Sequence, residues 1–235
     1  MSAQFAKIVL IGLVLAAVLI VSSPVASQPR ALSDLHAMVV GVGADGQVIA
    51  AGVPLTSGPW GTDYITVSHV LRMGRQYSVM DDGKSFTAAT GLAACSSQYH
   101  GIDVLILRVK ARQSAVVEWA DPAGLKAGDE LAILPRREFH PELVTVRFLH
   151  VNLLEWTKSK PSDWSQAWHN VMVADGMSKA GFSGSPWVRE GKVYGLLKGR
   201  VRPARQDKWY VVAETSSKVQ ECLKQLHYDD LIPRE

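Results

Sequence analysis

Residues 38–50 read MVVGVGADGQVIA, and this stretch predicts two strands joined by a tight turn. An apolar, β-branched run at 38–42 is followed by the turn residues Ala44-Asp45-Gly46 and by a second apolar run at 48–50. The same pattern recurs at residues 64–67, 77–80, 85–88, 104–109, 130–134, 143–149, 171–173, 187–188, 193–197 and 209–212. Further hairpin signals are Asp82-Gly83 and Glu190-Gly191. The chain therefore consists mainly of short strands.

One helix is predicted, at residues 216–228. Its apolar side chains, Val219, Cys222, Leu223 and Leu226, share one face. A small parallel α/β protein would need helices between its strands, and the sequence predicts none there. We therefore predict an all-β protein with one terminal helix, folded as two barrels joined near residues 111–127. We predict three parts: a separate N-terminal segment at residues 1–27, a first barrel at residues 28–120, and a second barrel with the helix at residues 121–235.

The N-terminal segment has the pattern of a secretory signal. Lys7 precedes an unbroken apolar run at residues 8–21, and small residues follow at 22–27. A retained membrane anchor is the alternative, with membrane contact only through residues 8–21. Both predict an exported protein, periplasmic or secreted. In that oxidising setting a Cys95–Cys222 disulfide is possible, and two unpaired thiols are equally compatible with the sequence.

The overall composition excludes several classes of protein. The chain has 235 residues, of which 47% are hydrophobic and 20% are charged, so it is not a disordered or collagen-like chain. Its net charge of +3 provides no wide basic surface, and we expect no nucleic-acid partner. No Cys/His spacing resembles a zinc site, and we expect no metal.

The most informative motif is Gly181-Phe182-Ser183-Gly184-Ser185-Pro186. Glycines beside a serine allow a tight turn that can point backbone N–H groups into one small space. Alone, the motif also fits an ordinary Gly/Ser/Pro turn. It does not fit the nucleophile elbow of α/β-hydrolases, because Ser185 stands where that motif has glycine. Ser183 is thus a candidate nucleophile.

Two further motifs could activate that serine. His69, in Thr66-Val67-Ser68-His69-Val70, is a candidate base, although any one of the seven histidines could be a surface residue. Asp103 opens the apolar run 104–109, where a partly buried carboxylate needs a partner such as an imidazole N–H. The order His, Asp, Ser is that of chymotrypsin-type enzymes. The base and acid fall in the first predicted barrel and the serine in the second, which predicts a site between the barrels.

These motifs resemble those of trypsin-like serine peptidases of the chymotrypsin fold, particularly the bacterial HtrA-like group. Thr66 to Val70 is similar to the family's Thr-Ala-Ala-His-Val, and residues 103–107 are similar to its Asp-Leu-Ala-Val-Leu. Residues 125–129 are similar to its Leu-x-x-Gly-Asp. The resemblance covers about residues 36–226 and implies two six-stranded antiparallel β-barrels with a C-terminal helix. HtrA proteins often add a PDZ domain, and we expect none before Glu235.

The resemblance also implies roles. Ser183 would be the nucleophile, His69 the general base and acid, Asp103 the orienting carboxylate, and the N–H groups of Gly181 and Ser183 the oxyanion hole. The substrate would be a peptide or protein, and no cofactor is implied. Phe182 stands where the family usually has Asp or Asn before the serine. The alternative is therefore a catalytically impaired protein of this fold that binds peptides or a protein partner.

Family positions also suggest a specificity pocket. Met177 and Ser178 would form its floor, and Leu196, Leu197 and Lys198 its wall. No acid stands at the floor, so we expect an apolar or small residue before the scissile bond rather than Arg or Lys. Basic residues crowd the following loop, at Lys198, Arg200, Arg202, Arg205 and Lys208. They are interpreted as a solvated hairpin tip, or alternatively as a surface for acidic peptides.

Overall fold

The computed structural model describes residues 30–70, 76–81, 84–95, 102–136, 143–151, 171–202 and 207–233. The predicted N-terminal segment, residues 1–27, lies outside these ranges, as do the Asp82-Gly83 turn and Arg205. Across the described part, no helix combines the length and the apolar character needed to cross a membrane.

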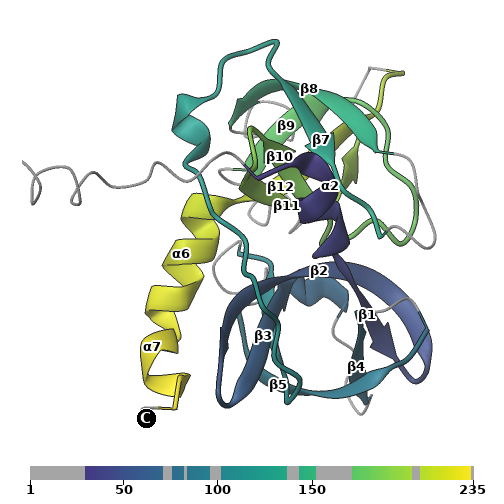
Figure 1. The fold of residues 1–235 in the computed structure, drawn as a ribbon. Helices are drawn as coiled ribbons and strands as arrows, with labels where there is room; N and C mark the ends of the chain where they lie inside the picture. The colour runs from purple at the N-terminus through teal and green to yellow at the C-terminus, as the bar shows by residue number, and fades with distance from the viewer. Residues whose placement is uncertain are drawn as a thin grey trace, which may run out of the picture.

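Six antiparallel strands close the first barrel in the order β1-β2-β3-β6-β5-β4 (Figure 1). Their bounds are β1 Val40–Ala44, β2 Gln47–Gly58, β3 Gly61–Thr66, β4 Tyr77–Met80, β5 Thr87–Cys95 and β6 Val104–Val109. The opening hairpin forms as predicted, with Ala44 paired to Gln47. Asp45 and Gly46 both have positive φ, 50° and 76°, as two-residue hairpin turns require.

The second barrel has the same design, with strands in the order β10-β11-β12-β9-β8-β7. Their bounds are β7 Glu130–Ile133, β8 Val144–Val151, β9 Val171–Asp175, β10 Pro186–Arg189, β11 Lys192–Val201 and β12 Tyr210–Thr215. Glu190 and Gly191 form the predicted β10–β11 turn, again with positive φ. The prediction of two six-stranded antiparallel barrels is confirmed.

The helices differ from the prediction of a single one. The terminal helix is two: α6 (Ser216–Gln225), whose N-cap Thr215 accepts a hydrogen bond from the backbone N–H of Lys218, and α7 (Tyr228–Leu231). His227 separates them because its φ of 48° is left-handed. A short helix, α2 (Leu32–Ala37), precedes β1. It has only six residues and two buried side chains, so its sequence carries no extended apolar periodicity.

The C-terminal helices are attached to the first barrel, although they follow the second in sequence. In Figure 1 they run from the second barrel down beside the first. Cys222 of α6 forms a disulfide with Cys95 of β5. The Tyr228 hydroxyl of α7 donates a 2.5 Å hydrogen bond to buried Asp63 of β3, whose carboxylate also forms a two-point ion pair with Arg108. Burial, together with that hydrogen bond, raises the pKa of Tyr228.

The largest apolar core spans both barrels, and a smaller one lies within the second barrel. The larger core combines first-barrel side chains with Leu134, Val188, Val193 and Leu196 of the second barrel. The smaller core fills the second barrel around Trp187 and Phe182. The backbone N–H of Ala51 in β2 donates to the carbonyl of Ser183 over 2.7 Å. The barrels therefore touch next to the predicted nucleophile.

Candidate active site

Adjacent strands bring the predicted base and acid together. His69 lies in a 3-10 turn, η1 (Ser68–Val70), just after β3, and Asp103 lies just before β6. Because Thr66 pairs with Leu105 in the antiparallel β3–β6 ladder, the end of one strand meets the start of the other. His69 Nδ1 lies 2.6 Å from Asp103 Oδ2. The other carboxylate oxygen, Oδ1, accepts hydrogen bonds from the His69 backbone N–H and the Ser68 hydroxyl, both at 2.8 Å.

These hydrogen bonds decide the charge of Asp103. Its side chain is 1% exposed, and burial by itself raises the pKa of a carboxyl. The hydrogen bond and charge of His69, the charge of Lys198 and the Ser68 hydroxyl act in the opposite direction. Together they lower the pKa of Asp103 below its ordinary value. The acid is therefore ionised at neutral pH and holds the proton of His69 on Nδ1.

The serine reaches the histidine from the other barrel. Ser183 Oγ lies 3.0 Å from Nε2 of His69. The turn that carries it is closed by hydrogen bonds from Ser185 N–H to the Phe182 carbonyl and from Gly184 N–H to the Leu197 carbonyl. The structure thus aligns Asp103, His69 and Ser183 in one hydrogen-bonded row across the barrel interface.

Two glycines shape this turn for different reasons. Gly184 has φ +81°, and a Cβ there would lie 2.0 Å from the Ala51 carbonyl oxygen. Gly181 has φ +88° with no atom near its missing Cβ, so only its backbone conformation favours glycine. Between them, Phe182 is 2% exposed and packs in the second-barrel core. The role of the Gly181 and Ser183 N–H groups as an oxyanion hole stays a prediction.

The five residues expected at a specificity pocket occupy different surroundings. Met177 is 76% exposed, and Ser178 is half-buried. Leu196 belongs to the larger core and Leu197 to the smaller one. The Lys198 ammonium turns inward and pairs with Glu214. No contact in the described ranges gathers these five side chains around a shared space, and the pocket stays a prediction.

Sequence reasoning missed two polar neighbours of Asp103. Ser68 donates to its carboxylate, and Glu214 accepts a hydrogen bond from its backbone N–H. Ser68 is adjacent to His69 in the sequence, which was a usable signal. Glu214 lies near the end of the apolar strand β12, and Asp103 lies just before the apolar strand β6, so the same argument about a buried acid applied to both. Within the described ranges, no group of three or more His, Cys, Asp or Glu residues could hold a metal ion.

No protein-family model matches the chain, and no curated protein matches it. Among solved structures, it is similar to the Rv3671c protease in an inactive form, with a TM-score of 0.61 and 17% identity over 87% of this chain and 96% of that one. The active form of this protease, from M. tuberculosis, gives a TM-score of 0.62 and 17% identity over 87% of each chain. This likeness shows that the chain has the chymotrypsin fold.

Proposed function

We propose that this chain, which has the chymotrypsin fold found in serine proteases, is a serine endopeptidase that hydrolyses peptide bonds through an acyl-enzyme. One observation carries the proposal: the row Asp103–His69–Ser183, with hydrogen-bond distances of 2.6 Å and 3.0 Å. In such a row a neutral imidazole can take the serine proton while the carboxylate fixes its tautomer and stabilises the imidazolium that forms.

The proposed reaction has two half-reactions. Ser183 Oγ attacks the peptide carbonyl carbon as its proton passes to His69 Nε2. The tetrahedral intermediate then expels the amine, which takes that proton, and an ester on Ser183 remains. A water molecule next attacks the ester, giving one proton to His69, and the acid leaves as Ser183 recovers its proton. The N–H groups of Gly181 and Ser183 are the proposed donors to the oxyanion.

The alternative is a binding protein of the same fold whose hydrolytic site is impaired by Phe182. The position of the Phe182 ring supports the enzyme instead. Because the ring is buried in the second-barrel core, it anchors the turn that carries Ser183.

A fluorophosphonate probe tests the proposal, because it reacts with a serine only where that serine is activated. We expect the folded protein to be labelled at Ser183 at pH 8, and Ser183→Ala to stay unlabelled. His69→Ala should lower the labelling rate by roughly three orders of magnitude or more, since the members of such a triad act as a unit. Absence of labelling in folded parent protein would favour the binding protein.

We further propose that the substrate residue before the scissile bond is apolar or small. The support is the absence of an acid at Met177 and Ser178, the positions that resemble the floor of the specificity pocket. Profiling cleavage of a peptide library is the measurement. A strong preference for Arg or Lys at that position would overturn this specificity.

Export of the protein is also a proposal. It is supported by the signal-like pattern of residues 1–27 and by the disulfide between Cys95 and Cys222, since disulfides persist mainly in oxidising compartments. Fractionation of cells that produce the full chain, followed by determination of the N-terminal residue, would test both the location and the cleavage. Recovery only from the cytoplasm with Met1 retained would contradict it.

A further inference from the structure

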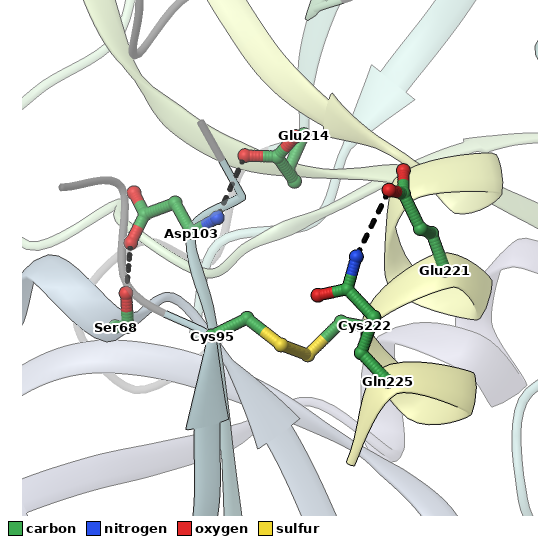
Figure 2. The surroundings of a disulfide bond; sticks show 7 residues. All are labelled: Ser68, Cys95, Asp103, Glu214, Glu221, Cys222 and Gln225. Carbon is green, nitrogen blue, oxygen red and sulfur yellow. Dashed lines mark hydrogen bonds between the residues drawn. A yellow bond between two sulfur atoms is a disulfide. The ribbon is translucent and has the colours of Figure 1, made fainter. Parts of the chain in front are cut away.

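A second buried carboxylate, that of Glu214, lies next to the backbone N–H of Asp103 (Figure 2). Glu214 stands near the end of β12 and is fully buried. Its Oε2 accepts a 3.0 Å hydrogen bond from the Asp103 backbone N–H and a 3.1 Å hydrogen bond from the Lys198 ammonium. Figure 2 shows Asp103 between two partners, with its carboxylate facing Ser68 and its backbone nitrogen facing Glu214. One residue of the candidate triad is thus held from both sides.

The charges around Asp103 come from four elements. His69 faces it from η1, Lys198 from β11 and Glu214 from β12, while Lys218 of α6 lies behind Glu214, 3.7 Å from its Oε1. Burial raises the pKa of Glu214, and Asp103 adds to that rise, whereas Lys198 and Lys218 oppose it. Burial also lowers the pKa of Lys218. Two carboxyl groups and two amino groups are thus buried together.

Stability alone does not account for this arrangement. Taking ions out of water is costly, and a buried ion pair replaced by packed apolar residues often leaves a protein equally stable or more so. The Lys198–Glu214 pair occupies the space behind the one carboxylate on which the candidate mechanism depends. Lys198 lies close enough to lower the pKa of Asp103 through its charge, and Glu214 holds the Lys198 ammonium by a direct hydrogen bond.

We propose that Glu214 and Lys198 are positioning residues for Asp103: Glu214 fixes its backbone, and the Lys198 ammonium holds the Glu214 carboxylate in place. This inference rests on the proposed peptidase function. Without Glu214, the Asp103 backbone N–H would lose its acceptor and the Lys198 ammonium would lose its hydrogen bond to Oε2. Without Lys198, the Glu214 carboxylate would keep the Lys218 ammonium, 3.7 Å away, but would lose its closer cation.

Substitutions of Glu214 and Lys198 should shift the acidic midpoint of the pH–labelling profile in opposite directions. A merely structural role would not produce shifts of opposite sign. Glu214→Gln keeps the size and removes a negative charge, so the acidic midpoint of the pH–labelling profile at Ser183 should fall by on the order of 0.5–1 pH unit. Lys198→Met removes a positive charge, so the midpoint should rise by a similar amount. The double variant removes both charges and should return the midpoint close to that of the parent protein.

Lys218→Met is the matched control, because it removes a buried ammonium near Oε1 of Glu214, the oxygen that does not bond the Asp103 N–H. Its midpoint should move less than that of Lys198→Met. At pH 8, Glu214→Gln should also label about tenfold or more slowly, because small displacements of a catalytic group are costly. Equal shifts in both lysine variants, or an unmoved midpoint in folded Glu214→Gln, would overturn the positioning role.

A second readout separates this inference from the proposed function. The midpoint of the His69 ring signals in an NMR titration, assigned by comparison with His69→Ala, requires no catalysis. If the probe does not label the parent, the peptidase proposal fails, while the NMR midpoints still decide whether Glu214 and Lys198 act on the triad. Glu214→Gln is isosteric, so it is the variant expected to keep the fold. The direction in which its NMR midpoint for the His69 ring moves is by itself enough to test the inference.

Discussion

Gly184 lies where the second barrel packs closely against the first. A Cβ at this position would lie 2.0 Å from the Ala51 carbonyl oxygen and 2.4 Å from Thr66 Oγ1. Both are atoms of the first barrel, and Ala51 itself bonds the carbonyl of Ser183. A single absent methyl group therefore sets how near the serine can come to the histidine.

Gly184→Ala should destabilise the protein by roughly 3 kcal/mol or more, because it adds a backbone clash to a left-handed φ. Urea unfolding at pH 7 measures this cost. Gly46→Ala is the matched control, since Gly46 has a similar φ of +76° with open space around it. It should cost about 1–2 kcal/mol. Equal costs at the two sites would show that the barrels do not press on Gly184.

Ionisation of Asp103 contributes to the pH dependence of the free energy of unfolding. Its pKa is lower in the folded protein than its ordinary value, so the ionised form stabilises the fold. That contribution is present above the unfolded pKa, near 3.9, and is lost as the pH falls through the folded pKa.

Asp103→Asn should therefore lower the free energy of unfolding at pH 7, and its difference from the parent should shrink as the pH approaches 3. Urea unfolding across that range measures it. Asp34→Asn, at an exposed position of α2, controls for the substitution itself. A difference that stays constant from pH 7 to pH 3 would contradict the assignment of a lowered pKa to Asp103.

At the scale of elements, the C-terminal helices are attached to the β3–β6 strand pair, next to which His69 and Asp103 lie. The ladder sets His69 against Asp103, and the same two strands supply Asp63 and Arg108. The Tyr228 hydroxyl of α7 hydrogen-bonds both Asp63, at 2.5 Å, and Thr56, at 2.8 Å. The buried carboxylate thus fastens the last helix to the strand pair that carries the site.

Tyr228→Phe should cost about 1–3 kcal/mol of stability, because it leaves a buried acceptor on Asp63 without one donor. Denaturant unfolding with the disulfide intact provides the measurement. Tyr194→Phe, at a half-buried tyrosine of β11, should change the free energy by less than about 0.5 kcal/mol. If both substitutions cost the same, the hydroxyl at 228 does not fasten the helix.

Strands with continuous apolar runs were the easiest elements to predict. The run at 104–109 matches β6, where five of six residues are buried, and the run at 77–80 matches β4, whose last two residues are buried. β2 and β11 extend beyond their predicted runs because polar or small residues such as Ser57 and Gly199 continue the backbone ladder. The Glu214–Lys198 pair escaped prediction because it depends on a contact between β11 and β12 that no local pattern encodes.

At the scale of the molecule, two barrels share a site and are joined by a covalent link outside it. The Cys95–Cys222 bond connects residues 127 positions apart, from β5 of the first barrel to α6 after the second. A loop of this length restricts the unfolded chain strongly, and loop-closure entropy predicts a stabilisation of about 5 kcal/mol.

Cys95→Ala combined with Cys222→Ala should therefore lose about 2–5 kcal/mol of stability. Urea unfolding of this variant, compared with the parent in its oxidised and reduced forms, is the measurement. Reduced parent and the double variant should unfold at similar urea concentrations. A parent midpoint unchanged by reduction would contradict the stabilising role.

The path of the disulfide also decides what a single cut in the chain can do. Residues 111–129, which connect the barrels, lie between the two cysteines in sequence. A protease that nicks this connector would leave both fragments on one covalent skeleton, and they would migrate as one band until a reductant is added. The disulfide therefore keeps the two barrels covalently joined even where the backbone of the connector is broken.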